Sequence, residues 1–414
     1  MADGSSRGID TEQTGSARYQ IIMVALLSLN FGIVFFDRNA LNFLMPFVQP
    51  DLHVSNTQVG LLAGALSLTW SVAAFGMGKL SDFTGKRKLL LVLSTVAFSL
   101  CSFLSGIASS FAMLLGARLL MGVAEGGVMP ISHAMVAAEV TPERRGLAQG
   151  IAQNFGSNLL GSFVAPVLLV ALAVNFGWRS SFYLAGIPGI ITAVLIWWFV
   201  KEPKAAPKAA RKEEIHYSMF DALKERNILI CVLMAILLVA YFVTALAFLP
   251  LYLTQMRHVS PDAMGWLMGT LGISATIGSF VIAGLSDRIG RRPVMIAMPL
   301  ISILLPLSAM YLGGSLWVLA ACFFIGWGVN GIFPLFMATV PSESVDPRHA
   351  ATVLGLCMGS GEIVGGVFAP FIAGFAADNV GLSAPLWMMV GLAAAGGILA
   401  FGLRETAPSQ RRAG

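Results

Sequence analysis

Charged residues are scarce in this sequence of 414 residues. Asp, Glu, Lys and Arg make up 11% of the chain and hydrophobic residues 57%, whereas a soluble globular chain carries roughly 25% charged residues. This scarcity excludes an ordinary soluble domain. Apolar runs of about 20 residues, the length that a helix needs to cross a bilayer, recur from Tyr19 to Leu403. The composition therefore predicts a polytopic membrane protein.

Cysteine and catalytic motifs are scarce as well. The four cysteines, at positions 101, 231, 322 and 357, all lie in apolar runs and form no CxxC pair, so we expect neither disulfides nor a metal cluster. The chain has no Walker loop, metal-ligand spacing or nucleophile motif, so we expect no enzyme and no cofactor. Residues 1–18 are polar and contain no apolar h-region, so we expect no cleaved signal peptide.

Twelve apolar spans are predicted, and all must be helical because backbone amides find no water partner in lipid. A polar tail (1–18) precedes them, and a second tail (404–414) follows. A linker rich in Lys, Pro and Ala (201–226), in which a short interfacial helix is possible, divides them into two bundles of six, residues 19–200 and 227–403. The spans are 19–48, 56–80, 88–108, 111–138, 147–174, 181–200, 227–255, 262–285, 294–312, 315–340, 350–377 and 383–403.

The distribution of basic residues predicts the orientation. If the N-terminus is cytoplasmic, all of the 26 lysines and arginines lie on the cytoplasmic side except Arg38, Arg118, Arg179 and Arg257. This asymmetry follows the positive-inside rule and explains the net charge of +5 better than a nucleic-acid-binding patch does. We expect a monomer in the cell (inner) membrane, in contact with lipid and not with nucleic acid, with both termini cytoplasmic.

The two bundles are predicted to be repeats. An offset of 205 residues matches Leu80-Ser81-Asp82 with Leu285-Ser286-Asp287, and Gly85-Lys86-Arg87 with Gly290-Arg291-Arg292. The same offset also aligns Pro142 with Pro347, Gly150 with Gly355, Gly156 with Gly361, Gly161 with Gly366 and Phe163 with Phe368. An internal duplication of six spans is typical of secondary transporters, whose substrate site lies near the midplane between the halves.

The loops after spans two and eight resemble a family signature. "GKLSDFTGKRK" is similar to the signature loop of the major facilitator superfamily, and "GLSDRIGRR" is similar to its second-half echo, although Gly78 faces Ala283. The resemblance covers residues 19–403 and implies the major facilitator fold. It also implies a cytoplasmic gate formed by Gly78, Asp82, Gly85, Arg87, Asp287, Gly290 and Arg291. A merely positive-inside loop explains the bases but not the matched Asp and Gly.

Five charged side chains fall well within the spans: Asp37, Arg38, Arg118, Glu125 and Glu362. On insertion scales they cost on the order of 10 kcal/mol together, so we expect them to face a cavity or one another. Arg118 and Glu125 are two helical turns apart, with Gly122 between them leaving room for a helix or a ligand. Asp37 and Arg38 lie about 100° apart, so one faces the cavity and the other a neighbouring helix. The alternative is two static ion pairs between spans one and four.

These residues also resemble a narrower group, the anion:cation symporters, which includes sugar-acid permeases and vesicular glutamate transporters. The likeness lies in the Asp37-Arg38 pair and in Arg118-x3-Gly122-x2-Glu125-Gly126. It implies that Arg38 and Arg118 bind a substrate carboxylate and that Asp37 and Glu125 carry protons. Arginine offers a permanently charged bidentate fork, which suits the first role.

Two positions depart from the sugar-acid permeases. Trp70 stands where these proteins tend to carry Tyr, and Glu362 is an additional acid, which the repeat aligns with Ser157. An aromatic or otherwise less polar carboxylate is therefore an alternative substrate, and Glu362 is a third candidate for proton coupling. Further candidate cavity residues are polar side chains within spans: Asn154, Asn158, Tyr241 and Asn330.

The sequence favours proton-coupled uptake of a small organic anion by alternating access. One alternative is a proton antiporter that exports drugs or lipids, either spinster-like or of the multidrug efflux type. Gly156, Gly161 and Pro166 echo the Gly-Pro motif of such antiporters only in part. A second alternative is a transporter-like sensor that binds without turnover. The sequence names neither the carboxylate nor the proton stoichiometry.

Overall fold

The computed structural model describes residues 16–203, 219–346, 349–407 and 410. These residues form helices and connecting turns, and twelve helical stretches among them are long and apolar enough to cross a membrane. The predicted spans are therefore confirmed, with ends shifted by a few residues. The twelve stretches are Ala17–Leu52, Asn56–Thr84, Arg87–Gly106, Phe111–Glu139, Leu147–Phe176, Trp178–Phe199, Arg226–Met256, Pro261–Ile289, Arg291–Tyr311, Leu316–Ser344, Thr352–Val380 and Ser383–Ala400.

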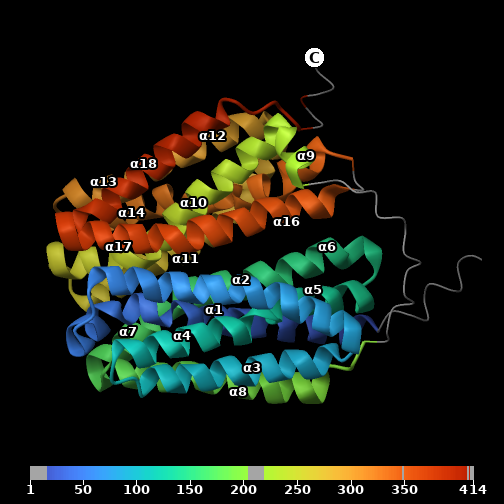
Figure 1. Ribbon diagram of the computed structural model, residues 1–414, viewed down its shortest axis with the longest axis horizontal. Helices are drawn as coiled ribbons and strands as arrows, with labels where there is room; N and C mark the ends of the chain where they lie inside the picture. Colours follow the sequence, from blue (N-terminus) through green and yellow to red (C-terminus); the bar gives the residue numbers. More distant parts are fainter. Residues whose placement is uncertain (1–15, 204–218, 347–348, 408–409, 411–414) are drawn as a thin grey trace, which may run out of the picture.

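The helices form two bundles of six spans, drawn blue to green and yellow to red in Figure 1. We call them the N-half and the C-half. The N-half contains α1 (Ala17–Leu52), α2 (Asn56–Thr84), α3 (Arg87–Gly106), α4 (Phe111–Gly126), α5 (Val128–Glu139), α6 (Pro142–Gly150), the π-helical η1 (Ile151–Phe155) and η2 (Ser157–Val164), α7 (Ala165–Phe176) and α8 (Trp178–Phe199).

The C-half repeats this arrangement after α9 (Met219–Lys224), a short helix within the predicted linker. It contains α10 (Arg226–Leu251), η3 (Tyr252–Met256), α11 (Pro261–Ile289), α12 (Arg291–Ser302), α13 (Leu304–Tyr311), α14 (Leu316–Trp327), η4 (Gly328–Ile332), η5 (Leu335–Thr339), α15 (Val340–Ser344), α16 (Ala350–Ser360), η7 (Gly361–Phe368), α17 (Ala369–Val380) and α18 (Ser383–Ala400).

The two halves share a π-helical irregularity at positions that the sequence repeat aligns. The π-helical segments η2 and η7 begin at Ser157 and Gly361 and lie in the fifth span of each half. Stretches of π-helix inside α-helices are frequent at functional sites. Both segments contribute to the cavity described below, through Ser157 and Glu362.

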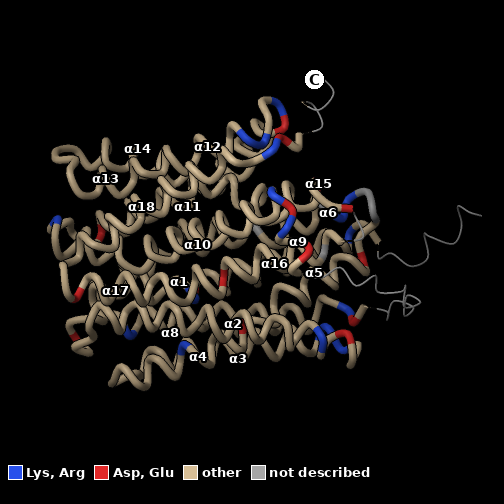
Figure 2. The backbone as a smooth tube through the Cα atoms, turned by 45° about the horizontal axis from the view of Figure 1, so that its top comes forward, with Lys and Arg blue, Asp and Glu red and all other residues tan. Residues whose placement is uncertain are grey.

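Charged residues gather at the two ends of the bundle and leave its middle nearly free of them (Figure 2). The end that carries Arg87 and Arg291 is called the basic end, and the end that carries Asn56 and Asp378 is called the opposite end. Large apolar side chains such as Phe75 and Trp198 are exposed along the helices, as a lipid-facing surface requires.

The halves are held together at the opposite end, where α2 packs against α17 and η7, and α11 against α7 and η2 (Figure 1). The carboxylate of Asp378 accepts hydrogen bonds from the backbone amides of Asn56 (3.0 Å) and Thr57 (2.8 Å) and from the Thr57 hydroxyl (2.5 Å). Gln255 donates to Gln49 across the same interface (2.8 Å). An acidic residue of the C-half therefore caps the first turn of an N-half helix, where the helix dipole favours negative charge.

Candidate functional site

A cavity of about 560 Å³ lies between the two halves, within the range of roughly 300–1,000 Å³ that is typical of ligand sites. Its walls come from α1, α2, α4, α5, η1 and η2 of the N-half and from α10, α11, α14, α16, η4, η5 and η7 of the C-half. Five of the residues that the sequence analysis singled out line it: Arg38, Arg118, Asn158, Asn330 and Glu362.

Arg38 is the basic side chain most clearly presented to the cavity. Its guanidinium carbon lies 5.7 Å from the centre of the Phe35 ring, one turn earlier on α1, and 5.2 Å from that of Trp70 on α2. Both distances suit cation–π contact, which holds a cation without neutralising its charge. The described ion pairs do not include Arg38. Its guanidinium is thus open to an anion in the cavity.

Asp37, the preceding residue, points away from the cavity and is completely buried. Its Oδ1 lies 2.6 Å from the hydroxyl of Ser102 on α3, and that hydroxyl is also 2.9 Å from the backbone carbonyl of Phe182 on α8. A serine hydroxyl has a single proton to donate. Both contacts are hydrogen bonds only if Asp37 is itself protonated and donates to Ser102, which then donates to Phe182. An ionised Asp37 takes the Ser102 proton and leaves the second contact unmade.

Arg118 and Glu125 are both buried on α4, 2% and 1% exposed. Nη1 of Arg118 donates to the backbone carbonyl of Arg38 (3.2 Å) and contacts the sulfur of Met121 (3.2 Å), while its Nε is unpaired among the described residues. Neither carboxyl oxygen of Glu125 has a hydrogen-bond partner in the described structure. An ionised carboxylate without partners is very costly to bury, so this position suits a group that binds a proton.

Static ion pairs between spans one and four are not what the structure shows. The described ion pairs include neither Asp37 nor Glu125. The link between these spans is instead the hydrogen bond from Arg118 to the Arg38 carbonyl. Gly122 accommodates a helix rather than a ligand: a Cβ there would lie 2.1 Å from the Thr69 hydroxyl and 2.6 Å from the Leu66 carbonyl of α2.

The remaining candidates divide between the cavity and the helix interfaces. Asn158 and Asn330 line the cavity, and Asn330 also donates to the carbonyl of Trp327 (3.1 Å). Tyr241 is placed behind the lining, where its hydroxyl donates to the carbonyl of Ser302 (2.9 Å) and ties α10 to α12. The side chain of Asn154 lies outside the described part of the structure.

The sequence analysis missed several polar lining residues. Asn42 lies one turn after Arg38 on α1, and Ser67 and Ser71 are one turn apart on α2, on either side of Trp70 in the sequence. Gln153 lines the cavity from η1. Helical spacing could have identified the first three, because Asn42 lies four residues after Arg38, Ser67 lies three before Trp70, and Ser71 lies four after Ser67.

The predicted gate loops lie at the basic end. In the N-half, Gly85 ends α2 with a φ of 67°, a conformation that favours glycine, and Arg87 pairs with Asp82 at 3.2 Å. Gly78 lies inside α2, and a Cβ there would meet only Pro130 of α5, at 3.8 Å.

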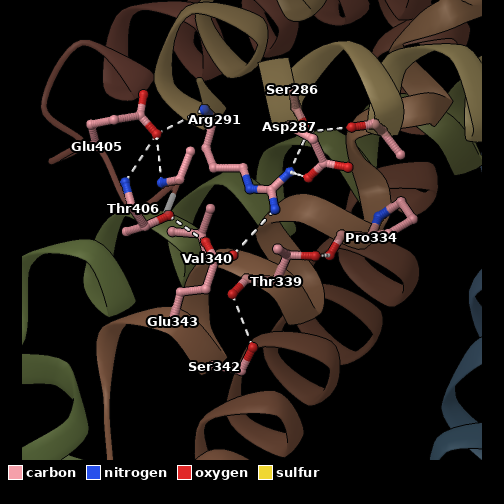
Figure 3. Close-up of polar contacts among 12 residues, drawn as sticks. Ser286, Asp287, Arg291, Pro334, Thr339, Val340, Ser342, Glu343, Glu405 and Thr406 are labelled. Atoms are coloured by element: carbon pink, nitrogen blue, oxygen red, sulfur yellow. Dashed lines mark hydrogen bonds and ion pairs between the residues drawn. The ribbon is translucent and has the colours of Figure 1, made fainter. Parts of the chain in front are cut away.

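The corresponding loop of the C-half is part of a larger network (Figure 3). Gly290 ends α11 with a φ of 106°. Arg291 contacts Asp287 (2.5 Å), the hydroxyl of Ser286 (2.6 Å) and Glu343 of α15 (3.2 Å). The repeat aligns Arg87 with Arg292, yet the pairing arginine here is Arg291. Arg292 instead donates to the carbonyl of Phe401 (2.9 Å).

Residues after α18 complete this network (Figure 3). The Thr406 hydroxyl donates to Glu343 (2.6 Å), and Glu405 accepts from the backbone amides of Arg291 (2.8 Å) and Arg292 (3.0 Å). Partial burial acts to raise the pKa of Glu405, but hydrogen bonds from the amides of Ala407, Arg291, Arg292 and Thr406 outweigh it and hold the pKa below its usual range. The tail is thereby joined to the start of α12.

Twelve spanning helices in two repeated halves, with a cavity between them that holds charged and polar side chains, define a membrane transporter. The sequence model of the Major Facilitator Superfamily matches two overlapping stretches, residues 27–356 and 244–414. The chain belongs to this family. The predicted family and fold are therefore confirmed.

Several known proteins are similar to this chain. The "Hexuronate transporter" of Bacillus subtilis (strain 168) is 29% identical over 89% of this chain and 90% of its own length. The "Probable 4-methylmuconolactone transporter" of Cupriavidus pinatubonensis is 29% identical over 80% of this chain and 78% of its own length. The "Multidrug resistance protein MdtG" of Proteus mirabilis is 27% identical over 77% of this chain and 80% of its own length.

A solved structure shares the fold. It is a bacterial homolog of the human lysosomal transporter spinster in an inward-facing, unoccupied conformation, with a TM-score of 0.74, 20% identity, and coverage of 94% of this chain and 96% of the other. At this identity the likeness supports the fold alone.

Proposed function

We propose that this transporter couples the uptake of a small organic anion to protons by alternating access. The observation that carries the proposal is the position of Arg38, whose charge faces the cavity without an acidic partner among the described ion pairs. Two buried carboxyl groups that lack a full set of partners, Asp37 and Glu125, lie in the same half. Anion recognition and proton binding thus occupy adjacent but separate positions.

In this proposal Arg38 binds the substrate carboxylate, and Arg118 supports it through the Arg38 carbonyl and from the cavity wall. Asp37 and Glu125 carry the protons. When these acids are ionised they attract both arginines and compete with the incoming anion; protonation ends that competition. Release of substrate then allows the acids to lose their protons, which resets the carrier. Glu362, which lines the cavity from η7, is the next candidate for a coupled proton.

We infer that the basic end faces the cytoplasm, with both termini on that side of the cell (inner) membrane, because lysine and arginine are retained there. The loops around Asp82–Arg87 and Asp287–Arg291 then form the cytoplasmic gate. The Asp378 contacts at the opposite end close the outer side in this conformation. We expect the transporter to act as a monomer among lipids.

The proposal is tested by uptake into proteoliposomes that contain the purified full-length protein. An imposed inward proton gradient is expected to drive accumulation of a radiolabelled carboxylate, and a proton-conducting ionophore is expected to abolish it. If accumulation instead requires an outward proton gradient, the protein is an antiporter. Binding without transport in either gradient indicates a sensor.

Export of drugs or lipids by proton antiport is the second candidate, and one observation favours it. The C-half wall of the cavity is built almost wholly of apolar and aromatic side chains, which suits a hydrophobic cargo. A neutral apolar cargo leaves Arg38 without a function, however, and this is why we rank anion uptake first.

A further inference from the structure

The two walls of the cavity differ in polarity. On the N-half wall, side chains that can form hydrogen bonds line the cavity together with Arg38, among them Asn42, Ser67, Ser71 and Asn158. On the C-half wall the lining is apolar apart from the indole of Trp327 and three polar side chains: Ser279, Asn330 and Glu362. A substrate that spans the cavity therefore meets a mixed surface with many polar groups on one side and a mostly apolar surface on the other.

Two of those three polar side chains are already hydrogen-bonded to backbone carbonyls. The Ser279 hydroxyl donates to the carbonyl of Ala275 (2.7 Å), and the Asn330 amide donates to that of Trp327 (3.1 Å). A hydroxyl group of a substrate that lies against this wall would find few partners. Polar groups buried without partners weaken binding, so the C-half wall disfavours polyhydroxylated molecules.

Three rings form what we call the aromatic shelf of the C-half wall: Phe242, Trp327 and Phe333. Phe242 is stacked on Trp327 (centroids 5.4 Å apart, planes at 28°) and meets Phe333 edge-on (5.8 Å, 61°). Trp327 is 2% exposed and packs against Phe242, and Phe242 and Phe333 are both half-buried. Rings packed against one another in this way offer a large apolar surface to a ligand.

The C-half wall also disfavours a second negative charge. Its described lining residues include no lysine, arginine or histidine, and they do include the acid Glu362. Glu362 lies near the midline: a Cβ on Gly366, one turn later, would be 3.4 Å from its Oε2 and 3.5 Å from Ser67 of α2. A dianion bound at Arg38 would place its second carboxylate near an acid, with no base on that wall to balance it.

We propose that this cavity selects amphipathic monocarboxylates, with the carboxylate at Arg38 and a ring or other apolar body against the aromatic shelf. This inference rests on the proposed function and names the substrate class. It separates the chain from carriers of sugar acids, whose hydroxyl groups would face the apolar wall. It also gives Glu362 a role as a specificity-determining residue on the C-half wall.

Two pairs of probes with matched rings test the selection. Dissociation constants of the purified full-length protein are measured by calorimetry for cyclohexanecarboxylate against quinate, and for benzoate against terephthalate. The first pair differs in ring hydroxyls and the second in a distal carboxylate. We expect the apolar monoanion of each pair to bind at least about tenfold more tightly. Equal or tighter binding of quinate or terephthalate overturns the inference.

Substitutions in the aromatic shelf test whether this part of the cavity is responsible for the preference for apolar acids. Phe242→Ala is expected to weaken the binding of benzoate roughly 2- to 10-fold, the usual range for loss of an aromatic contact. The affinity for quinate is expected to stay nearly unchanged. Phe333→Ala serves the same purpose if the first variant does not fold. The control Phe280→Ala removes a phenyl ring that is 72% exposed on α11 and is expected to change neither constant. Unchanged benzoate binding in both shelf variants overturns the assignment.

Glu362→Gln is expected to bring the dissociation constants of benzoate and terephthalate closer together. An unchanged ratio of these two constants overturns the role given to Glu362. Failure of this inference is distinguishable from failure of the proposed function. If quinate binds more tightly and Arg38→Ala abolishes its binding, the organic-anion carrier stands and the apolar selection fails. If none of the four acids binds, both fail.

Discussion

Arg118 donates a hydrogen bond to the backbone carbonyl of Arg38, 3.2 Å away, and so joins α4 to α1 next to the cavity. The carbonyl belongs to the residue whose side chain lies between Phe35 and Trp70. The two intramembrane bases are therefore not independent: one faces the cavity, and the other holds the backbone that presents it. Loss of either is expected to disturb the same binding event.

Arg38→Ala and Arg118→Ala are each expected to abolish carboxylate binding while the protein still inserts. Loss of a charged, bidentate contact weakens binding about 100-fold or more. Arg38→Lys keeps the charge but not the planar fork and is expected to give an intermediate affinity. Calorimetry on the purified variants measures the effect.

Arg179→Ala is the control for these variants, because it also removes one arginine but from an ion pair with Asp51 at the opposite end (2.7 Å). The dissociation constant of the carboxylate from this variant is expected to match that from the wild-type protein. Unchanged affinity in Arg38→Ala would refute the anion site. Unchanged affinity in Arg118→Ala alone would reduce that residue to a packing role.

The sequence predicts the spans and the internal repeat well, because both depend on strong local signals. Apolar length identifies the helices, and the matched Asp and Gly of the two gate loops identify the duplication. The 100° between Asp37 and Arg38 predicts that they face different surroundings, but it does not decide which one faces the cavity. That choice depends on where Ser102 and Trp70 lie, and those residues come from other helices.

The aromatic shelf lies beyond what the sequence alone reveals. In a transmembrane helix the residues that face lipid, neighbouring helices and a cavity are all apolar, so periodicity does not separate them. Phe242 and Phe333 come from α10 and from the turn before η5, and only the packing of these segments brings them together. Tyr241 shows the same difficulty, since its polar group suggested the cavity but bonds to Ser302 instead.

Asp378→Ala is expected to loosen the contact between the halves at the opposite end. Three hydrogen bonds to one carboxylate hold α17 against the start of α2. Their exposure to solvent limits the net effect to roughly 1 kcal/mol, about a fivefold shift toward conformations open at that end. A cysteine placed at Val59, which is 2% exposed and lines the cavity, reports the opening through its reaction rate with a membrane-impermeant thiol reagent.

Asn379→Ala is the matched control for Asp378, because its amide bonds only to Phe375 within the same helix (2.8 Å) among the contacts described. Labelling at position 59 is expected to accelerate with Asp378→Ala and not with Asn379→Ala. Equal rates in all three proteins would mean that glycine-mediated packing of α2 against α17, rather than this carboxylate, closes the opposite end.

Docking of the C-terminal tail is expected to weaken in acid. The pKa of Glu405 lies below its usual range in the folded protein. Its contribution to the stability of tail docking is therefore fully present above the ordinary glutamate pKa of about 4.3. That contribution is lost as the pH falls through the lowered value. Hydrogen exchange of the Arg291 and Arg292 amides, corrected for its intrinsic pH dependence, measures the loss.

Glu405→Ala is expected to show low protection of these amides at every pH. Glu225→Ala removes the same charge at the basic end, from an exposed position at the start of α10, and is expected to retain the wild-type profile. If Glu405→Ala keeps full protection at neutral pH, the tail is held by Thr406 and Glu343 instead.

The last prediction concerns proton coupling and follows from the contacts of the two buried acids. A protonated Asp37 completes the chain through Ser102 to Phe182, and Glu125 has no described partner that would stabilise its charge. Asp37→Asn and Glu125→Gln imitate the protonated forms, so both variants are expected to bind the carboxylate and to exchange it in counterflow. They are expected to lose proton-driven accumulation, because neither side chain can release a proton after delivery. Both activities are measured in the same proteoliposomes. Undiminished accumulation in both variants would place the coupled proton elsewhere, and Glu362→Gln would then be the variant to measure.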